Sequence, residues 1–207
     1  MTTRKLMVVT AGLGEPSSSR MLADQLSEAA KAQLSSPDTS VDVETVELRD
    51  HALDIANNFI TGYPAPKLSS VVDRLTQADA LVVVSPVFSG SYSGLFKSFF
   101  DLVDSTALAH IPVLMGATGG SPRHALMLEH AMRPLFSYLR AVVVPTAIYA
   151  SPEDWGTGSS TEQSLEQRVH RAARELGTAV RDSPRNGTDP TRIRPDFETL
   201  LHPPTHH

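Results

Sequence analysis

One stretch near the start of the chain decides the fold: Leu6-Met7-Val8-Val9-Thr10-Ala11-Gly12-Leu13-Gly14-Glu15-Pro16-Ser17-Ser18-Ser19-Arg20. Its first six residues are an almost unbroken apolar run of strand length, which is typical of a strand covered on both faces in a parallel sheet. A glycine-rich turn follows. Apolar residues then recur at the helical period through Leu34, and they predict a helix. A strand, a turn and a helix in this order form the first half of a βαβ unit.

The same pattern repeats along the chain. Three more apolar runs predict strands at Ala80–Val84, Pro112–Ala117 and Ala141–Ile148. The alternating segment Val41–Leu48 predicts an edge strand with one face in water. Helical periodicity covers residues 21–34, 68–78, 95–103, 126–139 and 165–180. Strands that alternate with helices predict an α/β fold, a doubly wound parallel sheet of five strands with helices on both faces, in the flavodoxin-like order 2-1-3-4-5.

The 207 residues suffice for one domain, which we place at residues 1–181. The segment 182–207 is rich in Pro, Arg, Asp and Thr, so we expect a tail that is mobile or wraps around a neighbouring subunit. Its histidines, His202, His206 and His207, fit a chain end better than a metal site. Asn57–Lys67 is predicted to be a long irregular loop that either packs on its own domain or contacts another subunit.

Composition excludes several classes of protein. The absence of cysteine excludes disulfides, thiolate metal sites and iron–sulfur clusters, and we predict no metal site of any kind. The net charge of −5 and the lack of a basic stripe argue against nucleic-acid binding. No apolar run approaches the about 18 residues of a membrane span, and the N-terminus does not resemble a signal peptide. We therefore expect a cytoplasmic protein that acts on neither nucleic acid nor membrane.

The first turn has the chemistry of a phosphate site. Ligands of open parallel sheets bind beyond the carboxyl ends of the strands. Gly12 and Gly14 let the backbone turn tightly, and Ser17 to Ser19 offer hydroxyls and free N–H groups where a helix begins. Arg20 can add a charge-assisted hydrogen bond. The turn is neither G-x-G-x-x-G nor a Walker A loop, and the alternative is that Ser17 only caps the helix.

The second candidate segment follows the third predicted strand and runs from Ser85 to Lys97. Pro86 is expected to end that strand because it lacks an N–H. The small residues that follow, up to Gly94, expose backbone groups that can bind the edge of a flat polar ring. Pro86, Val87 and Phe88 would form a wall along one face of that ring. The alternative is a plain strand-to-helix connection with Phe88 in the core.

The third candidate segment is Gly116–His124. Gly119 and Gly120 are expected to leave backbone amides uncovered, which suits an electron-rich carbonyl. Pro122 fits the first position of a helix. Taken alone the segment could equally be a generic turn.

Together the three segments, with the run Met132-Arg133-Pro134-Leu135, resemble the NAD(P)H-dependent FMN reductase family of flavodoxin-like proteins. The resemblance covers residues 4 to about 180. It is closest to the group that supplies reduced flavin to luciferase-like and alkanesulfonate monooxygenases. It implies an oxidoreductase that binds FMN and NAD(P)H, forms a homodimer or homotetramer, and transfers hydride from nicotinamide to flavin N5. Some relatives carry an extra residue in the helix after the second segment, and none is evident between Gly90 and Lys97.

The resemblance also implies site residues, in three groups. The residues that would hold the FMN phosphate are Gly12, Ser17, Ser19 and Arg20. The residues along the flavin ring and ribityl chain are Pro86, Val87, Phe88, Ser89, Gly90 and Ser91. The pyrimidine edge would meet Thr118, Gly119 and Gly120. No side chain is predicted to act as a catalytic acid or base, because the cofactor carries the chemistry.

Three other functions remain open at this point. The protein could keep FMN bound and reduce quinones, azo dyes or metal oxyanions. It could be a flavodoxin-like electron carrier, although such carriers usually place aromatic side chains on both faces of the ring. The third segment has no aromatic residue, and Phe88 alone cannot cover both faces, which favours an oxidoreductase with one face open to nicotinamide. A non-enzymatic interaction domain is the last alternative, and it would bind no flavin.

Overall fold

The computed structural model describes residues 2–155 and 164–183. The strands are β1 (Thr2–Thr10), β2 (Thr39–Glu47), β3 (Ala80–Phe88), β4 (Ser91–Tyr92), β5 (Pro112–Thr118), β6 (Val142–Val143) and β7 (Ile148–Ala150). The α-helices are α1 (Ser18–Leu34), α2 (Ala52–Thr61), α3 (Pro66–Thr76), α4 (Gly94–Phe100), α5 (Arg133–Tyr138) and α6 (Leu165–Asp182). Short 3₁₀ turns lie at Leu48–His51, Pro122–His124 and Pro152–Trp155, and a π turn lies at Leu128–Met132.

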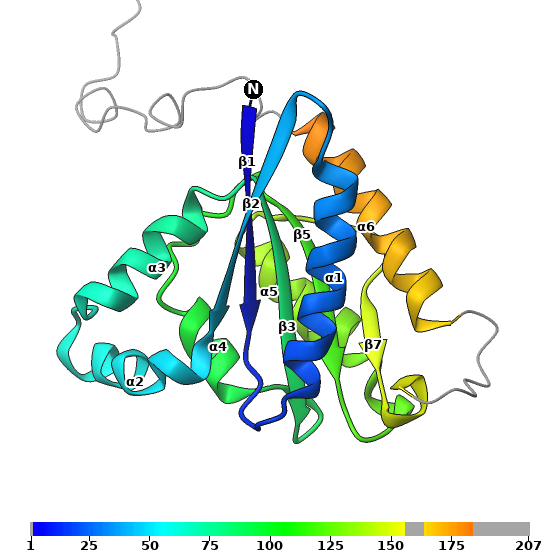
Figure 1. Cartoon of the computed structure of the whole chain (residues 1–207). Helices are drawn as coiled ribbons and strands as arrows, with labels where there is room; N and C mark the ends of the chain where they lie inside the picture. Colours follow the sequence, from blue (N-terminus) through cyan, green and yellow to red (C-terminus); the bar gives the residue numbers. More distant parts are fainter. Residues whose placement is uncertain (1, 156–163, 184–207) are drawn as a thin grey trace, which may run out of the picture.

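The sheet is parallel along the path β2-β1-β3-β5-β6, with β7 also parallel to β5. The carboxyl ends of its strands lie at one edge, the lower edge in Figure 1. The predicted doubly wound, flavodoxin-like α/β fold is confirmed. The strand order departs from the predicted series in two places, because β4 forms a short antiparallel hairpin with β3 and two short strands stand where one was predicted.

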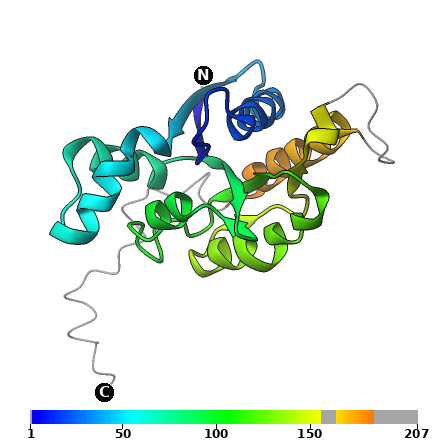
Figure 2. The same ribbon diagram turned by 90° about the horizontal axis from the view of Figure 1, so that it is seen from below.

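Helices cover both faces of the sheet, and each face has its own core (Figure 2). On one face, α1 and α6 pack against the side chains of β1 that point their way, Leu6 and Val8. On the other face, α2 to α5 pack against Met7 and Val9. Phe100 lies at the centre of an aromatic cluster on this second face, with ring centroids 4.7 Å from Phe96 and 4.9 Å from Phe136. These two cores hold the strand ends in place.

The predicted fifth strand, Ala141–Ile148, is wrong as a single strand. Residues 142–143 and 148–150 form β6 and β7, and the chain between them leaves the sheet. Pro145 cannot donate to a strand ladder. Side chains bind the backbone there instead: Arg133 donates to the carbonyls of Val144 (3.1 Å) and Pro145 (3.0 Å), and the Glu175 carboxylate accepts from the Thr146 amide at 2.7 Å.

Three further expectations are corrected. Asn57–Lys67 is not a long loop, because α2 and α3 cover most of it and only residues 62–65 connect them. Gly62 ends α2 in the left-handed conformation (φ 73°), a common way to end a helix that the sequence prediction overlooked. Pro86 does not end β3, which continues to Phe88 as one arm of the hairpin. The helix predicted at 126–139 is a π turn followed by α5, and Pro134 lacks the N–H that a regular helix would use there.

The predicted tail lies outside the described residues, apart from Asp182, which ends α6, and Ser183. His202, His206 and His207 fall in that part. Within the described ranges, residues 2–155 and 164–183, no helix combines the length and the apolar character that crossing a membrane requires.

Candidate functional site

Three segments meet at the carboxyl edge of the sheet, as the sequence predicts. We call residues 11–17 the first loop, residues 86–93 the second loop and residues 119–124 the third loop. The Ala11 amide donates to the Val84 carbonyl at 3.0 Å, which joins the first loop to β3. Pro86 on β3 lies opposite Thr118 on β5. Figure 2 looks onto this edge, so the three loops face the viewer.

The first loop folds tightly because Gly12 has no side chain. A Cβ atom at Gly12 would lie 2.0 Å from the Ser17 Oγ, so only glycine allows this approach. Ser17 is the N-cap of α1, and its Oγ accepts from the Arg20 amide at 3.2 Å. The capping role that the sequence left open for Ser17 is therefore present. Within the described residues, the Ser18 and Ser19 amides have no hydrogen-bond acceptor.

The free amides give α1 the properties of an anion site. A helix of 17 residues carries partial positive charge at its first turn, and unpaired N–H groups there point toward a bound anion. Thr10, directly before the loop, adds a buried hydroxyl that has no partner among the described residues. These donors fit a phosphate group.

A buried hydroxyl pair links the start of α1, just after the first loop, to the end of β5, just before the third loop. The Ser19 Oγ lies 2.7 Å from the Thr118 Oγ1, and both residues are almost completely buried. Each hydroxyl points toward the other rather than into solvent. Ser19 can therefore offer its amide to an anion more readily than its hydroxyl.

Arg20 lies in a cluster of charged side chains, which we call the charge cluster: Glu15, Arg20, Asp24, Glu47, Arg49 and Asp50. Arg20 pairs with Asp24 at 2.8 Å and with Glu47 at 2.5 Å. The hydrogen bond that Arg20 donates to the Asp24 carboxylate is the main reason that the pKa of Arg20 is raised. Arg49 pairs with Glu15 at 2.7 Å and with Glu47 at 3.1 Å, and it donates to the Gly14 carbonyl at 3.3 Å. Arg49 thus holds the first loop against the end of β2.

The second loop is a two-residue β-hairpin. Ser89 (φ 50°) and Gly90 (φ 81°) both adopt positive φ, as a type I′ turn requires. Ser85 anchors the hairpin, because its buried Oγ accepts from the Ser93 amide at 2.9 Å. Phe88 is 47% exposed, so the alternative that it belongs to the core is wrong. The hairpin presents Phe88 beside the edge of the sheet.

The third loop is shaped by Tyr149. The Gly119 amide donates to the Ala150 carbonyl at 3.1 Å, so the expectation that this amide is uncovered is wrong. A Cβ at Gly119 would lie 2.1 Å from the Tyr149 Oη, and the Tyr149 hydroxyl donates to the Ser121 carbonyl at 2.8 Å. Burial raises the pKa of the Tyr149 phenol, which therefore stays protonated and able to donate. Gly120 is exposed, and a Cβ added there would meet no other atom within 4 Å.

Four residues of this edge escaped the sequence prediction: Ser85, Glu47, Arg49 and Tyr149. Ser85 stands inside the quoted second segment, but its polar anchoring role depends on the hairpin. Glu47 is near the end of the predicted edge strand Val41–Leu48 and Arg49 directly follows it, so their position at the carboxyl edge could have marked them. Tyr149 directly follows the predicted fifth strand, and nothing in the sequence indicated that it reaches the third loop.

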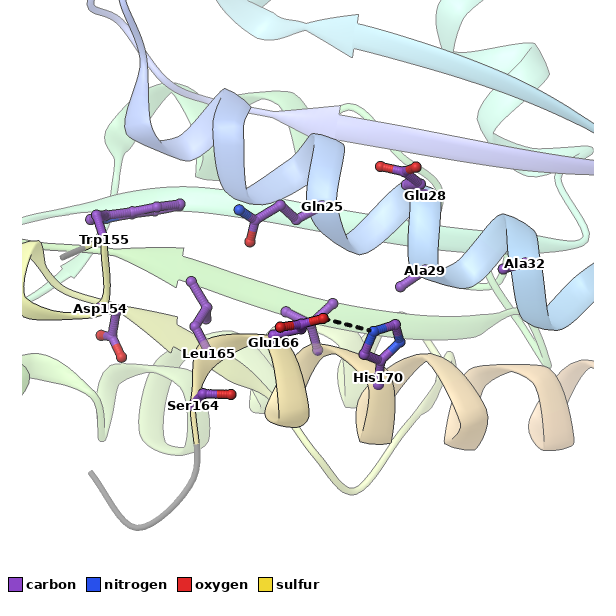
Figure 3. A pocket seen from close by; sticks show the side chains of 11 residues that line it. Gln25, Glu28, Ala29, Ala32, Asp154, Trp155, Ser164, Leu165, Glu166 and His170 are labelled. Atoms are coloured by element: carbon purple, nitrogen blue, oxygen red, sulfur yellow. Dashed lines mark ion pairs between the residues drawn. The ribbon is translucent and has the colours of Figure 1, made fainter. Parts of the chain in front are cut away.

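A cavity of about 630 Å³ lies elsewhere, between α1 and α6 (Figure 3). None of its lining residues comes from the three loops. Glu28, Asp154 and Glu166 give it an acidic lining, and Glu166 faces His170 at 3.8 Å. Acidic side chains repel a phosphate, so this cavity is not the predicted flavin site.

Comparison with known proteins decides the family. The sequence model of NADPH-dependent FMN reductases matches residues 4–156, which is most of the chain. The chain belongs to this family. The reductase is 38% identical over 169 residues to "FMN reductase (NADPH)" of Pseudomonas aeruginosa, covering 82% of this chain and 88% of that protein.

Two more relatives agree. "NADH-dependent FMN reductase SfnF" of Pseudomonas fluorescens is 39% identical over 171 residues, covering 83% of the reductase and 90% of the relative. The crystal structure of an oxidoreductase from Corynebacterium diphtheriae superposes with a TM-score of 0.83 at 43% identity, covering 88% of the reductase and all of that chain. The reductase is therefore an oxidoreductase that uses FMN and NAD(P)H, as the resemblance implied.

Proposed function

We propose that this reductase binds FMN across the three loops and supplies reduced FMN to a flavin-dependent monooxygenase. The observation that carries the proposal is the 2.7 Å contact between the Ser19 and Thr118 hydroxyls. It brings the phosphate-type donors of the first loop and the small residues of the third loop to one edge. A single FMN molecule has both chemistries, a terminal dianion and a flat polar ring.

Each loop then has a role in binding. The FMN phosphate would lie at the start of α1, near Gly12 and Ser17, with donors from the Ser19 amide and from Arg20. The ring and ribityl chain would run along the second loop, from Pro86 to Ser91 and past Val87, Phe88, Ser89 and Gly90. The pyrimidine edge would meet Thr118, Gly119 and Gly120. The exposed Gly120 backbone supports this, because it leaves room for a ring to approach.

When bound, FMN supplies the redox chemistry by accepting a hydride from reduced nicotinamide. The protein would position the two rings and stabilise the charge that forms on the flavin. The hairpin would border the ring, and the Gly120 amide would be a donor for negative charge on its carbonyl edge. Holding two rings in contact lowers the barrier without an acid or base side chain. One open face of the ring leaves room for nicotinamide.

Arg20→Ala tests the phosphate assignment. We expect FMN affinity to fall about tenfold or more, because a charge-assisted hydrogen bond is worth about 1.5–3 kcal/mol. Riboflavin, which lacks the phosphate, should bind equally well to both proteins. Calorimetric titration with each flavin measures the difference.

Arg74→Ala is the matched control, since Arg74 also pairs with a β2 carboxylate, Glu44 at 2.8 Å, which lies opposite Met7 rather than at the carboxyl end of β1. It should leave both affinities unchanged. An equal loss of FMN and riboflavin in Arg20→Ala would contradict a phosphate site at this arginine.

The supply of reduced FMN can be tested with a bacterial luciferase as the acceptor enzyme. We expect light when the reductase, FMN and NADPH or NADH are mixed with luciferase and its aldehyde substrate, because luciferase consumes free reduced FMN. A protein that keeps its flavin would instead reduce a quinone rapidly and give no light. That outcome would favour the alternative of an FMN-bound quinone, azo or metal-oxyanion reductase.

We also infer a cytoplasmic homodimer or homotetramer, since closed symmetric oligomers are the common state of such enzymes. Large apolar side chains on and after α2 support an interface: Leu53, Ile60 and Tyr63 are each more than 80% exposed. Sedimentation velocity would measure the oligomeric state.

A further inference from the structure

We propose that Glu47 competes with the flavin phosphate for Arg20 and so sets how weakly the reductase holds FMN. The inference rests on the proposed FMN site and deepens it. It assigns a role in affinity to a carboxylate that the sequence prediction passed over.

The fold places Glu47 at the site. It is the last residue of β2 and lies opposite Thr10, the last residue of β1. The first loop starts directly after Thr10. The Glu47 side chain is only 17% exposed, so it is held beside the loop and is screened poorly by solvent. A negative charge fixed at this point acts on any anion that the first loop binds.

Arg20 is already occupied by carboxylates. Its Nη1 donates to the Glu47 Oε1 at 2.5 Å, and its Nε donates to the Asp24 Oδ1 at 2.8 Å. Two of the five guanidinium N–H groups are thus held by carboxylates, so a phosphate at Arg20 would have fewer donors available and would bind beside two negative charges. The other oxygen of Glu47 lies 3.1 Å from the Arg49 Nε, so Glu47 bridges both arginines of the charge cluster.

The charge balance of the cluster adds to the competition. Two arginines face four carboxylates, those of Glu15, Asp24, Glu47 and Asp50. The cluster is therefore net negative, while the flavin phosphate brings up to two further negative charges. The helix terminus and its free amides attract the phosphate, and the cluster repels it. An affinity held down in this way suits an enzyme that must release reduced FMN.

Glu47→Gln provides the test. We expect the dissociation constant of FMN to fall about tenfold, because the variant removes one fixed negative charge and frees Arg20 to donate to the phosphate. The dissociation constant of riboflavin should change less than about twofold, since riboflavin has no phosphate to repel. Calorimetric titration with both flavins at low and at high salt measures this, and added salt should shrink the gain.

Glu44→Gln is the matched control. Glu44 is on the same strand and pairs with an arginine, Arg74, but this pair lies three residues earlier and contacts α3. The control removes the same charge from β2 without touching Arg20. It should leave both flavin affinities unchanged.

Asp24→Asn gives a second, independent variant in case Glu47→Gln disturbs the first loop. The Asp24 side chain is 53% exposed, and its loss should tighten FMN in the same direction by a smaller factor. Unchanged or weaker FMN binding in both variants would overturn the inference, because Glu47 would then position Arg20 rather than compete for it.

Flavin titrations of the wild type distinguish a failure of this inference from a failure of the proposed FMN site. If the wild type prefers FMN to riboflavin and the variants do not change that preference, only the role of Glu47 fails. If the wild type binds the two flavins equally, the phosphate site fails as well.

Discussion

Gly119→Ala is expected to cause the largest loss of stability and activity at the third loop. The new Cβ would lie 2.1 Å from the Tyr149 Oη, well below the 3.0 Å that Cβ atoms essentially never approach in real structures. Either the loop or the Tyr149 ring must move, and overpacking of this kind costs about 1–3 kcal/mol. Moving the loop also displaces the backbone that we assign to the pyrimidine edge. Chemical denaturation and FMN-dependent oxidation of NAD(P)H measure the two effects.

Tyr149→Phe supplies the control for this prediction. Alone, it removes the hydrogen bond from the Tyr149 hydroxyl to the Ser121 carbonyl and should cost about 1 kcal/mol. In the double variant the nearest ring atom would be the former Cζ, 3.2 Å from the Cβ, so the clash is mostly relieved. We expect the double variant to be more stable than Gly119→Ala alone. If the stability losses of the two single variants simply add in the double variant, the Tyr149 hydroxyl is not the obstacle.

Gly12→Ala is expected to have the second large effect, at the proposed phosphate site. Its Cβ would lie 2.0 Å from the Ser17 Oγ, which must then leave the position from which it caps α1. Loss of an N-cap costs about 0.5–2 kcal/mol, and it turns the first helical amides away from a common point. We therefore expect FMN affinity to fall about tenfold or more, with riboflavin affected less.

The double variant Gly12→Ala/Ser17→Ala distinguishes folding from binding. Removal of the Ser17 hydroxyl makes room for the new Cβ, so thermal stability should recover in part. FMN affinity should not recover, because the loop then lacks its cap. Recovery of both would argue that the first loop contributes to stability alone and that the phosphate binds elsewhere.

The sequence predicted the buried part of the fold well because continuous apolar runs have few other uses. The runs Leu6–Ala11 and Pro112–Ala117 predicted covered strands, and residues 6–10 and 112–117 form them. The sequence prediction failed where a residue interrupts a strand and side chains from other elements bind the backbone that is exposed. Pro145 broke the fifth strand, and the side chains of Arg133 and Glu175, remote in sequence, bind the backbone that the break exposes.

The candidate site was predictable in place but not in detail. Glycine and serine after three strands indicated the edge where the loops meet. Which donors remain free depends on partners that spacing does not reveal. The Gly119 amide donates to the Ala150 carbonyl, the Ser19 and Thr118 hydroxyls bind each other, and Arg20 donates to Glu47.

The buried hydroxyl pair of Ser19 and Thr118 couples the two ends of the proposed flavin site mechanically. A movement of the α1 terminus toward an anion would pull on β5, and a shift of the third loop would reach back into the helix. Binding of the phosphate end and binding of the ring end of the flavin would then be coupled. A substitution that strengthens binding at one end would then need a compensating substitution at the other end.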